Sequence, residues 1–158
     1  MAGESRQQEE GHAVTYLGID PGKSGALAIL REGGAVEVVP FDPEAYLAAF
    51  RSVPAGDARC LVEHVGAMPG NGGVSMFSFG ENFGIIQGML AATGIPFQLV
   101  RPQKWKKEYT LNHSKENSVE VCKRLFPGVN LKRTERSKKD DDNIAEAILM
   151  AEYARRHL

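Results

Sequence analysis

Three short apolar segments near the N-terminus limit the fold of this chain more than any other feature. They cover residues 16–20, 26–30 and 35–41, and a Pro-Gly pair and a Glu-Gly-Gly triplet separate them. Strands joined by turns this tight pair antiparallel, because a parallel partner needs a long crossover connection. The domain is therefore predicted to begin with a three-stranded antiparallel meander.

Strand-like and helix-like segments alternate through the rest of the chain. Two more strands are expected over 59–65 and 96–100, and a basic loop is expected over 130–139. Helices are expected over 43–53, 74–93, 102–109, 114–126 and 142–157. The first of these helices has Asp42 in position to cap it and Pro43 at its first turn. This order predicts an α/β fold with a five-stranded mixed sheet flanked by helices.

The length and composition of the chain suit one packed domain. Its 158 residues are 42% hydrophobic and 25% charged, which is too short for two ordinary domains and too apolar for a largely disordered chain. No run approaches the roughly 18 consecutive apolar residues of a membrane helix, and residues 1–13 lack the apolar core of an export signal. We therefore expect a cytoplasmic protein with a disordered tail over 1–13, a domain over 14–158, and free thiols at Cys60 and Cys122.

Charge is distributed unevenly, although the chain as a whole has a net charge of −1. Residues 1–100 carry 5 basic and 11 acidic side chains, residues 101–139 carry 12 and 4, and residues 140–158 carry 2 and 5. A basic segment between two acidic ones favours a polyanion as the partner. The alternative is a solvated lysine-rich surface without a partner, and charge alone leaves both interpretations open.

Three carboxylates lie in apolar sequence surroundings. Asp20 ends the first strand, Glu63 lies within the strand over 59–65, and Glu146 lies among the apolar residues of the last helix. A carboxylate left unpaired in such a position costs several kcal/mol, so bound divalent cations are the expected partners. Each could instead have a local role, Asp20 as a turn cap and Glu63 on a solvated sheet face. All three together, on adjacent elements, favour a metal site.

The run Asp140-Asp141-Asp142 leaves the identity of a fourth acidic ligand open. Asp142 lies four residues before Glu146 and shares a helix face with it if the helix has already begun there. Asp141 could reach the same site only from a loop that precedes the helix. All three aspartates also suit a helix N-terminus, where they would stabilise the helix dipole.

A carboxylate cluster of this kind predicts two-metal phosphodiester hydrolysis. Two Mg²⁺ ions roughly 3.5–4 Å apart would span the scissile phosphate, and Mn²⁺ is expected to substitute for them. One ion would lower the pKa of a water molecule, and the other would stabilise the leaving 3′ oxygen.

The segment Pro21-Gly22-Lys23-Ser24 is similar to the end of a nucleotide-binding P-loop. That motif needs a glycine five residues before Gly22, where this chain has Leu17, and it leads into a helix rather than a strand. No nucleotide cofactor is therefore expected.

A glycine-rich loop over 66–73 precedes two phenylalanines that could contact nucleic acid. Glycine lets a backbone approach a ligand closely, and apolar side chains beside such a loop can wedge between base steps. Phe77 and Phe79 are the candidates, although a place in the helix core is equally consistent with their spacing. Trp105, set among lysines, is interpreted as a helix anchor packed on the sheet, and His64 as a packed side chain on the face opposite Glu63.

These motifs resemble those of the RuvC-type Holliday-junction resolvases. The segment from Leu17 to Ala26 resembles the first motif of that family, Glu63 matches its second acidic position, and the stretch from Lys138 to Ala147 resembles its C-terminal acidic helix. The resemblance covers residues 14–155 and is nearest to phage and prophage members and to the chloroplast resolvases of plants. It implies an RNase H-like fold and Mg²⁺-dependent paired nicks across a four-way DNA junction. It also implies a homodimer, for which the apolar helix over 74–93 is the expected surface.

The resemblance also implies roles for individual residues. The implied metal ligands are Asp20, Glu63, Glu146 and either Asp142 or Asp141. The family usually has an aspartate where this chain has Asn143, which leaves the fourth ligand undecided. Lys115 is expected near the scissile phosphate. Contacts with the DNA are expected from Lys23, Phe77, Phe79, Lys104, Lys106, Lys107, Lys132, Arg133, Lys138 and Lys139.

Two other functions remain open on the sequence. An RNase H-like nuclease that cuts RNA or flap DNA would share the metal chemistry and would differ in substrate preference. A non-catalytic junction-binding protein would have lost its metals, and the acidic positions that this chain keeps argue against it. A kinase-like protein with the same strand and turn would need about twice this length.

Overall fold

A mixed five-stranded sheet forms the centre of the fold. The computed structural model describes residues 13–64, 66, 70, 72–111 and 117–158. The strands are β1 (Thr15–Ile19), β2 (Ala26–Leu30), β3 (Val36–Pro40), β4 (Ala58–Glu63) and β5 (Phe97–Val100). Their order is β3-β2-β1-β4-β5; β2 pairs antiparallel with both β1 and β3, whereas β4 pairs parallel with both β1 and β5. The predicted meander and mixed sheet are confirmed.

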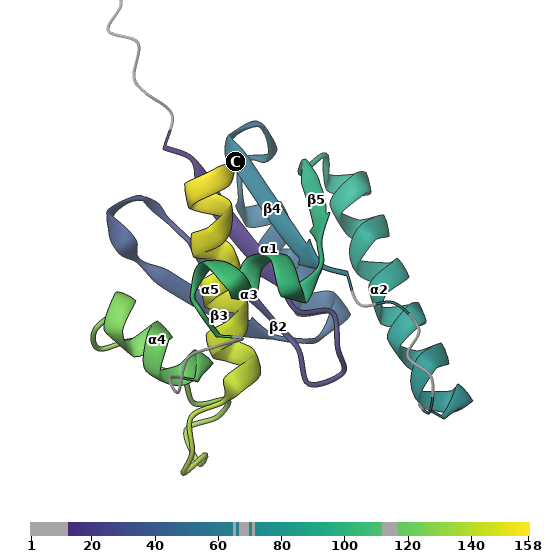
Figure 1. Ribbon diagram of the computed structural model, residues 1–158. Coiled ribbons are helices and arrows are strands. Elements are labelled where there is room, and N and C mark those ends of the chain that lie inside the picture. The colour runs from purple at the N-terminus through teal and green to yellow at the C-terminus, as the bar shows by residue number, and fades with distance from the viewer. Residues whose placement is uncertain (1–12, 65, 67–69, 71, 112–116) are drawn as a thin grey trace, which may run out of the picture.

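Helices cover both faces of this sheet (Figure 1). They are α1 (Pro43–Ser52), α2 (Gly73–Thr93), α3 (Pro102–Glu108), α4 (Ser118–Leu125) and α5 (Asp142–His157). Two 3-10 turns complete the described elements: η1 (Glu32–Gly34) lies between β2 and β3, and η2 (Ala55–Asp57) lies between α1 and β4. None of the helices in the described ranges has the length and apolar character needed to cross a membrane. In Figure 1, α5 crosses one face of the sheet, and the N-terminal half of α2 extends beyond the β5 side.

The sheet divides the interior into two hydrophobic cores. Neighbouring residues of a strand point to opposite faces, so Leu61 packs with α3, α4 and α5, whereas Val62 packs with α1 and α2. Cys60 and Cys122 are buried in these cores as free thiols, as predicted. Burial on both faces explains why β1 and β2 are almost continuous apolar runs.

One predicted helix begins later than expected. The helix over 142–157 agrees at both ends, and the other boundaries agree to within two residues, but the helix predicted over 114–126 begins at Ser118. Asn117 caps it, because the Asn117 side chain accepts from the Glu120 amide at 3.0 Å and the Glu120 carboxylate accepts from the Asn117 amide at 2.9 Å. This reciprocal capping box fixes the start of α4. Residues 112–116 lie outside the described residues, as does most of the tail predicted over 1–13.

β1 and α5 approach each other closely at Gly18. A Cβ atom at this position would lie 2.3 Å from the carbonyl oxygen of Ala147 and 2.4 Å from the amide nitrogen of Ala151. Both atoms belong to the backbone of α5, which cannot move aside without separating the helix from the sheet. Glycine at the centre of β1 therefore sets how near α5, and the carboxylate it carries, lies to the sheet.

Replacing Gly18 with alanine is expected to lower the free energy of unfolding by about 3 kcal/mol, because the added methyl group overpacks the contact between β1 and α5. Urea unfolding followed by circular dichroism measures the change. Gly56→Ala is the matched control, since a Cβ atom there meets nothing within 4 Å. Equal stability of the Gly18→Ala variant and the wild type would show that α5 can shift at little cost.

Candidate active site

Three elements end or begin at one edge of the sheet and bring carboxylates together there. β1 and β4 are parallel neighbours with Ile19 opposite Val62, so the next residues, Asp20 and Glu63, follow at the same edge. α5 starts at this edge as well, and Glu146 lies one turn into it. The parallel pairing of two strands distant in the sequence thus creates the site.

Asp20 is held in the turn between β1 and β2. Its Oδ1 atom accepts a hydrogen bond from the amide of Gly22 at 3.1 Å. Burial raises the pKa of Asp20; the Gly22 amide opposes this shift, the negative charge of Glu146 adds to it, and the cations Lys106 and Arg133 oppose it. The aspartate is therefore disfavoured as an anion in the absence of a further cation.

Glu63 is the most enclosed of the three carboxylates, with 7% of its surface exposed. The indole Nε1 of Trp105 donates a hydrogen bond to its Oε2 atom at 2.7 Å. Burial raises the pKa of Glu63 to about 7, against the hydrogen bond from Trp105, and the negative charges of Asp20 and Glu146 raise it further. Lys106 acts in the opposite direction. Glu63 thus exchanges its proton near neutral pH.

Glu146 has two polar partners from different helices. Lys106 of α3 places its Nζ atom 3.0 Å from Glu146 Oε1, and the hydroxyl of Ser118 at the start of α4 donates to the same oxygen at 3.2 Å. Lys106 was expected to contact DNA, but the structure places it beside the carboxylates. Its charge also acts on Asp20 and Glu63, so one lysine partly neutralises three acids.

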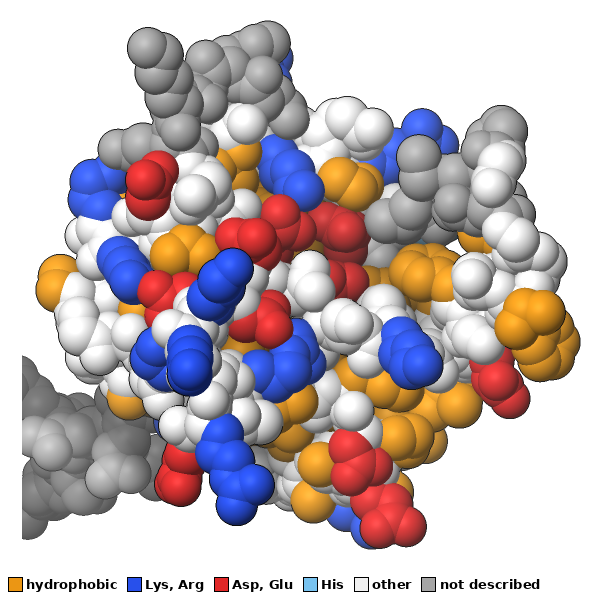
Figure 2. All heavy atoms as spheres, turned by 90° about the horizontal axis from the view of Figure 1, so that it is seen from below, with side chains coloured by type: hydrophobic (Ala, Val, Ile, Leu, Met, Phe, Trp, Pro, Cys, Tyr) orange, Lys and Arg blue, Asp and Glu red, His pale blue; other side chains and the backbone are white. Residues whose placement is uncertain are grey.

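The three carboxylates form one electrostatically coupled set, which we call the acidic cluster. The negative charges of Asp20 and Glu146 both disfavour ionisation of Glu63, and Glu146 does the same for Asp20. Figure 2 views the molecule from the end where α5 begins and shows acidic side chains gathered near the middle of this face with basic side chains around them. A set of three carboxylates that nearby cations neutralise only in part favours the binding of a further cation.

The donor set of the acidic cluster fits hard divalent cations such as Mg²⁺, which take oxygen ligands. Within the described residues, however, no three His, Cys, Asp or Glu side chains already stand in the arrangement of a metal site. The reason is that each carboxylate is held by its own partner: Asp20 by Gly22, Glu63 by Trp105, and Glu146 by Lys106 and Ser118.

Asp141 and Asp142, the two candidates for a fourth ligand, have different surroundings. Asp141 caps α5, since its Oδ1 accepts from the amides of Asn143 at 2.9 Å and Ile144 at 3.2 Å, and its Oδ2 accepts from Arg133 Nε at 2.7 Å. Partial burial alone would raise the pKa of Asp141, but the hydrogen bonds from Arg133 and Ile144 hold it below its usual range. Asp142 is the exposed first residue of α5, one turn before Glu146. Of the two, Asp142 is the one without a capping role.

Most of the lysines predicted to contact DNA are exposed. Those that the structure describes in the turn after β1, on α3 and in the loop before α5 are Lys23, Lys104, Lys107, Lys132, Lys138 and Lys139. Lys115, predicted near the scissile phosphate, lies outside the described residues. The contacts themselves remain a prediction.

Arg133 joins segments around the site instead of standing free. Besides Asp141, its guanidinium donates to the carbonyl oxygens of Ser24 and of Gly25, the latter at 3.4 Å. It therefore ties the turn after Asp20 to the start of α5. The sequence indicated a DNA contact for Arg133 and gave no sign of this bridge.

The two phenylalanines predicted to contact DNA have different environments on α2. Phe77 is 73% exposed, whereas Phe79 is half-buried and stacks on Phe83, with the ring centroids 6.1 Å apart. Phe83 packs against the core and stacks on His64, with the ring centroids 5.6 Å apart, so His64 is a packed side chain as predicted. Phe77 is thus the more accessible of the two candidates.

Trp105 is the residue whose connection to the site the sequence did not reveal. It is fully buried, which confirms its place as an anchor, but its indole N–H also reaches Glu63. A buried tryptophan usually has a hydrogen-bond acceptor, and Glu63 was a buried acceptor of unknown partner. A buried donor at Trp105 and a buried acceptor at Glu63 are therefore the signal that could have linked the two residues.

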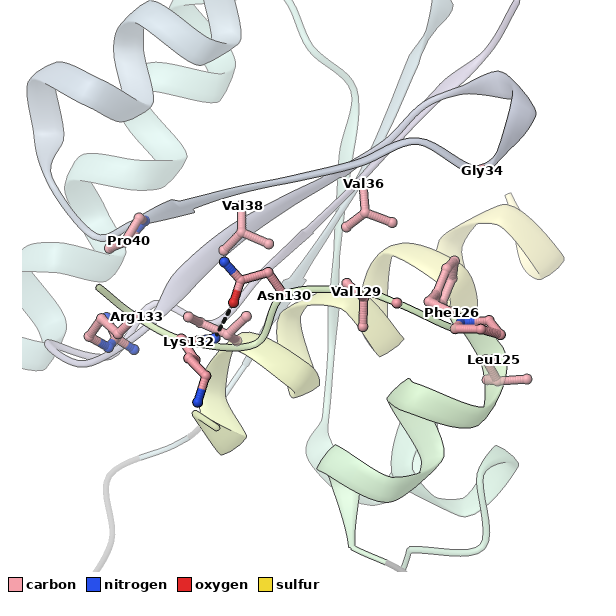
Figure 3. A pocket seen from close by; sticks show the side chains of 13 residues that line it. Gly34, Val36, Val38, Pro40, Leu125, Phe126, Val129, Asn130, Lys132 and Arg133 are labelled. Atoms are coloured by element: carbon pink, nitrogen blue, oxygen red, sulfur yellow. Dashed lines mark hydrogen bonds between the residues drawn. The ribbon is translucent and has the colours of Figure 1, made fainter. Parts of the chain in front are cut away.

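A hollow of about 630 Å³ lies apart from the acidic cluster, between β3 and the segment after α4 (Figure 3). Val36 and Val38 line one side, Phe126 and Asn130 line the other, and none of Asp20, Glu63 and Glu146 takes part. The Asn130 side chain accepts from the amide of Lys132 at 3.0 Å, which shapes the rim. The site is therefore identified by its charges rather than by a cavity.

Comparisons with known proteins show which solved structures share this architecture. No protein-family model matches the chain, and no curated protein matches it in sequence. RuvC of Thermus thermophilus in complex with a Holliday junction substrate is similar in structure, with a TM-score of 0.57 and 18% identity over 91% of this chain and 96% of that chain. A second Thermus thermophilus RuvC structure is similar with a TM-score of 0.58 and 19% sequence identity, over 90% of this chain and 96% of that chain. The yeast mitochondrial Holliday junction resolvase Ydc2 is similar with a TM-score of 0.51 and 16% sequence identity, over 85% of this chain and 75% of that chain. At such identities the likeness establishes the fold, and the chain has the RuvC-like, RNase H-like architecture that its motifs predicted.

Proposed function

We propose that this chain is a metal-dependent endonuclease that resolves four-way DNA junctions by paired symmetric nicks. The observation that carries the proposal is the acidic cluster, in which β1, β4 and α5 bring Asp20, Glu63 and Glu146 to one edge of the sheet beside Lys106. The RuvC-like fold supports the choice of substrate, because the similar structure of Thermus thermophilus RuvC contains a Holliday junction.

Asp20, Glu63, Glu146 and Asp142 are the residues that would hold two Mg²⁺ or Mn²⁺ ions. The chemistry that such ions supply is the activation of a water molecule and the stabilisation of the leaving 3′ oxygen. With its pKa raised to about 7, Glu63 is only partly ionised at neutral pH, and a bound cation would favour its anionic form. Lys106 neutralises Glu146 in the absence of an ion. Once released, its ammonium group can bind a phosphate of the DNA instead.

Binding of the DNA arms is assigned to the exposed lysines around the acidic cluster and to Phe77. Lys104 and Lys107 lie on α3, the helix that carries Lys106, and Lys138 and Lys139 lie in the loop before α5, the helix that carries Glu146. Phosphate contacts of this kind position the duplex arms without reading their sequence. The contact of Lys115 with the scissile phosphate, expected from the sequence, is part of the same proposal.

A homodimer formed through α2 would give the two active sites that paired nicks require. The exposed face of α2 carries a stripe of glycines four residues apart, Gly80, Gly84 and Gly88, and a Cβ atom at any of them meets nothing within 4 Å. Phe77 and Ile85, both exposed, lie beside this stripe. Glycine within a helix costs roughly 0.5–1 kcal/mol relative to alanine, so three in a row along one face favour close packing of a second helix.

Replacing Gly84 with glutamine is expected to weaken the dimer about tenfold or more, because a long side chain blocks the close approach of two helices. The monomer fold is expected to persist, since the position is open and glutamine favours a helix more than glycine does. Sedimentation velocity over a range of concentrations measures the effect. Ser75→Gln, at an exposed position on the side of the same helix opposite the stripe, is the control. Unchanged dimerisation of the Gly84→Gln variant would exclude this face.

Substrate preference tests the proposed function against its alternatives. The wild-type protein is incubated with Mg²⁺ and a labelled four-way junction, a duplex of the same sequence, a flap, or an RNA–DNA hybrid. Cleavage confined to the junction supports the proposal. Preferred cleavage of the flap or the hybrid would identify a different RNase H-like nuclease, and binding of the junction without cleavage in Mg²⁺ or Mn²⁺ would identify a non-catalytic junction-binding protein.

A further inference from the structure

Two consecutive residues of the short helix α3 hold two members of the acidic cluster. Trp105 donates its indole N–H to Glu63 Oε2 at 2.7 Å, and Lys106 places its ammonium group 3.0 Å from Glu146 Oε1. The two contacts differ in kind. The lysine is a mobile cation with 27% of its side chain exposed, whereas the tryptophan is fully enclosed.

α3 is itself fastened to α5, at the middle of that helix and at its C-terminal end. The Tyr109 hydroxyl, directly after α3, donates to the carbonyl oxygen of Leu149 at 2.9 Å. Glu108, the last residue of α3, pairs with Arg156 at 3.1 Å and with His157. The indole of Trp105 is therefore held in place through contacts of α3 with α5, at Leu149 and at the C-terminal end of the helix, and these contacts restrict how its N–H meets Glu63.

The chemistry of the indole suits it to orient a ligand without competing for the ion. An indole N–H is a donor only and carries no charge, so it cannot coordinate a cation and does not repel one. It occupies one oxygen of the Glu63 carboxylate and leaves the second oxygen for another partner. Groups that hydrogen-bond to a metal-ligating carboxylate fix its direction and typically change metal affinity or activity by 10- to 100-fold when they are removed.

We propose that Trp105 is a positioning residue for the divalent-cation site, acting through the hydrogen bond from its indole N–H to Glu63. This inference rests on the proposed metal-dependent function and deepens it. Trp105 touches neither the reacting phosphate nor the ion; it restricts the Glu63 carboxylate to the direction in which it can serve as a ligand together with Asp20 and Glu146.

The test compares Trp105→Phe with Tyr109→Phe in the full chain without DNA. Each variant removes one buried hydrogen bond of the α3 region, but only the first removes a bond to the acidic cluster. Binding of Mn²⁺ is measured from the electron paramagnetic resonance signal of the free ion, and folding is checked by urea unfolding. The Mn²⁺ dissociation constant is expected to rise about 10- to 100-fold for Trp105→Phe and to change less than about twofold for Tyr109→Phe.

Intrinsic fluorescence gives a second, independent reading, because Trp105 is the only tryptophan of the chain. Mg²⁺ is expected to change the emission of the wild type and of Tyr109→Phe, and to do so over the concentration range in which Mg²⁺ displaces Mn²⁺. In Glu63→Gln, which keeps an oxygen acceptor for the indole but loses the anionic ligand, the change is expected to require much more Mg²⁺.

The outcomes separate this inference from the proposed function. If the wild type binds Mn²⁺ and both phenylalanine variants bind it equally well, or lose it equally, the positioning role of Trp105 is overturned while the metal site stands. The positioning role would also be overturned if Mn²⁺ binds to the wild type but Mg²⁺ does not change the fluorescence of Trp105. If the wild type binds no divalent cation, the metal-dependent function is overturned, and the role of Trp105 is overturned with it.

Discussion

Asp20→Asn is expected to abolish cleavage of a four-way junction while leaving its binding intact. Asparagine keeps the oxygen that accepts from the Gly22 amide, so the turn after β1 is preserved. It removes the negative charge that an ion needs at the end of β1. Since a metal ion supplies several kcal/mol of transition-state stabilisation, cleavage should fall by roughly 1,000-fold or more.

Single-turnover cleavage and a gel-shift titration of the same labelled junction measure the two effects. Asp42→Asn is the matched control, because Asp42 is an exposed helix cap outside the acidic cluster that asparagine replaces equally well. The Asp20→Asn protein should also unfold at a temperature equal to or above that of the metal-free wild type, since one buried repulsive charge is gone. If the Asp20→Asn variant cleaves the junction as fast as the wild type, the assignment of Asp20 to the metal site is refuted.

The stability of the metal-free protein is expected to fall as the pH rises from about 4.5 to about 7. Glu63 has an ordinary pKa of 4.5 and a pKa of about 7 in the folded protein, so in this interval the folded state binds more protons than the unfolded state. The free energy of unfolding then decreases with pH, by about 3 kcal/mol across the full interval for this group. Asp20, whose pKa is also raised by burial, acts in the same direction.

Urea unfolding between pH 4.5 and 8 in EDTA measures this slope. Asp141 and Glu152, whose pKa values are lowered in the folded protein, lose their contribution only at more acidic pH and so do not mask it. Glu63→Gln should flatten the profile above pH 5, and Mg²⁺ should restore the stability of the wild type above pH 7 because it binds the ionised cluster. If the free energy of unfolding of the wild type instead rises steadily up to pH 8, the pKa of Glu63 is not raised in the folded protein.

Much of the fold follows from local signals in the sequence. The two tight turns fix the meander of β1, β2 and β3, and the cap at Asp42 fixes the start of α1, because each depends on residues within a few positions. The late start of α4 has a local cause too, the capping box of Asn117 and Glu120, which the apolar pattern alone did not reveal.

The acidic cluster was predictable in its members but not in its connections. Asp20, Glu63 and Glu146 stand out because each interrupts an apolar run, and the structure places them at one edge of the sheet. The bonds from Trp105 to Glu63 and from Lys106 to Glu146 join residues about 40 positions apart, and such contacts leave no periodic trace in a sequence.

The choice between Asp141 and Asp142 shows the same limit on a smaller scale. Either aspartate could cap α5 on sequence, and the hydrogen bonds from the amides of Asn143 and Ile144 identify Asp141 as the capping residue. Asp142 is left as the proposed fourth ligand.

The most direct measurement of the central claim maps the cuts in a four-way junction whose four strands are labelled in turn, with Mg²⁺ and with EDTA. The acidic cluster and a two-fold dimer together predict paired nicks at symmetric positions on two opposed strands, present with Mg²⁺ and absent with EDTA. Cuts that persist in EDTA, or cuts confined to one strand at protein concentrations where the dimer is formed, would contradict the proposed function.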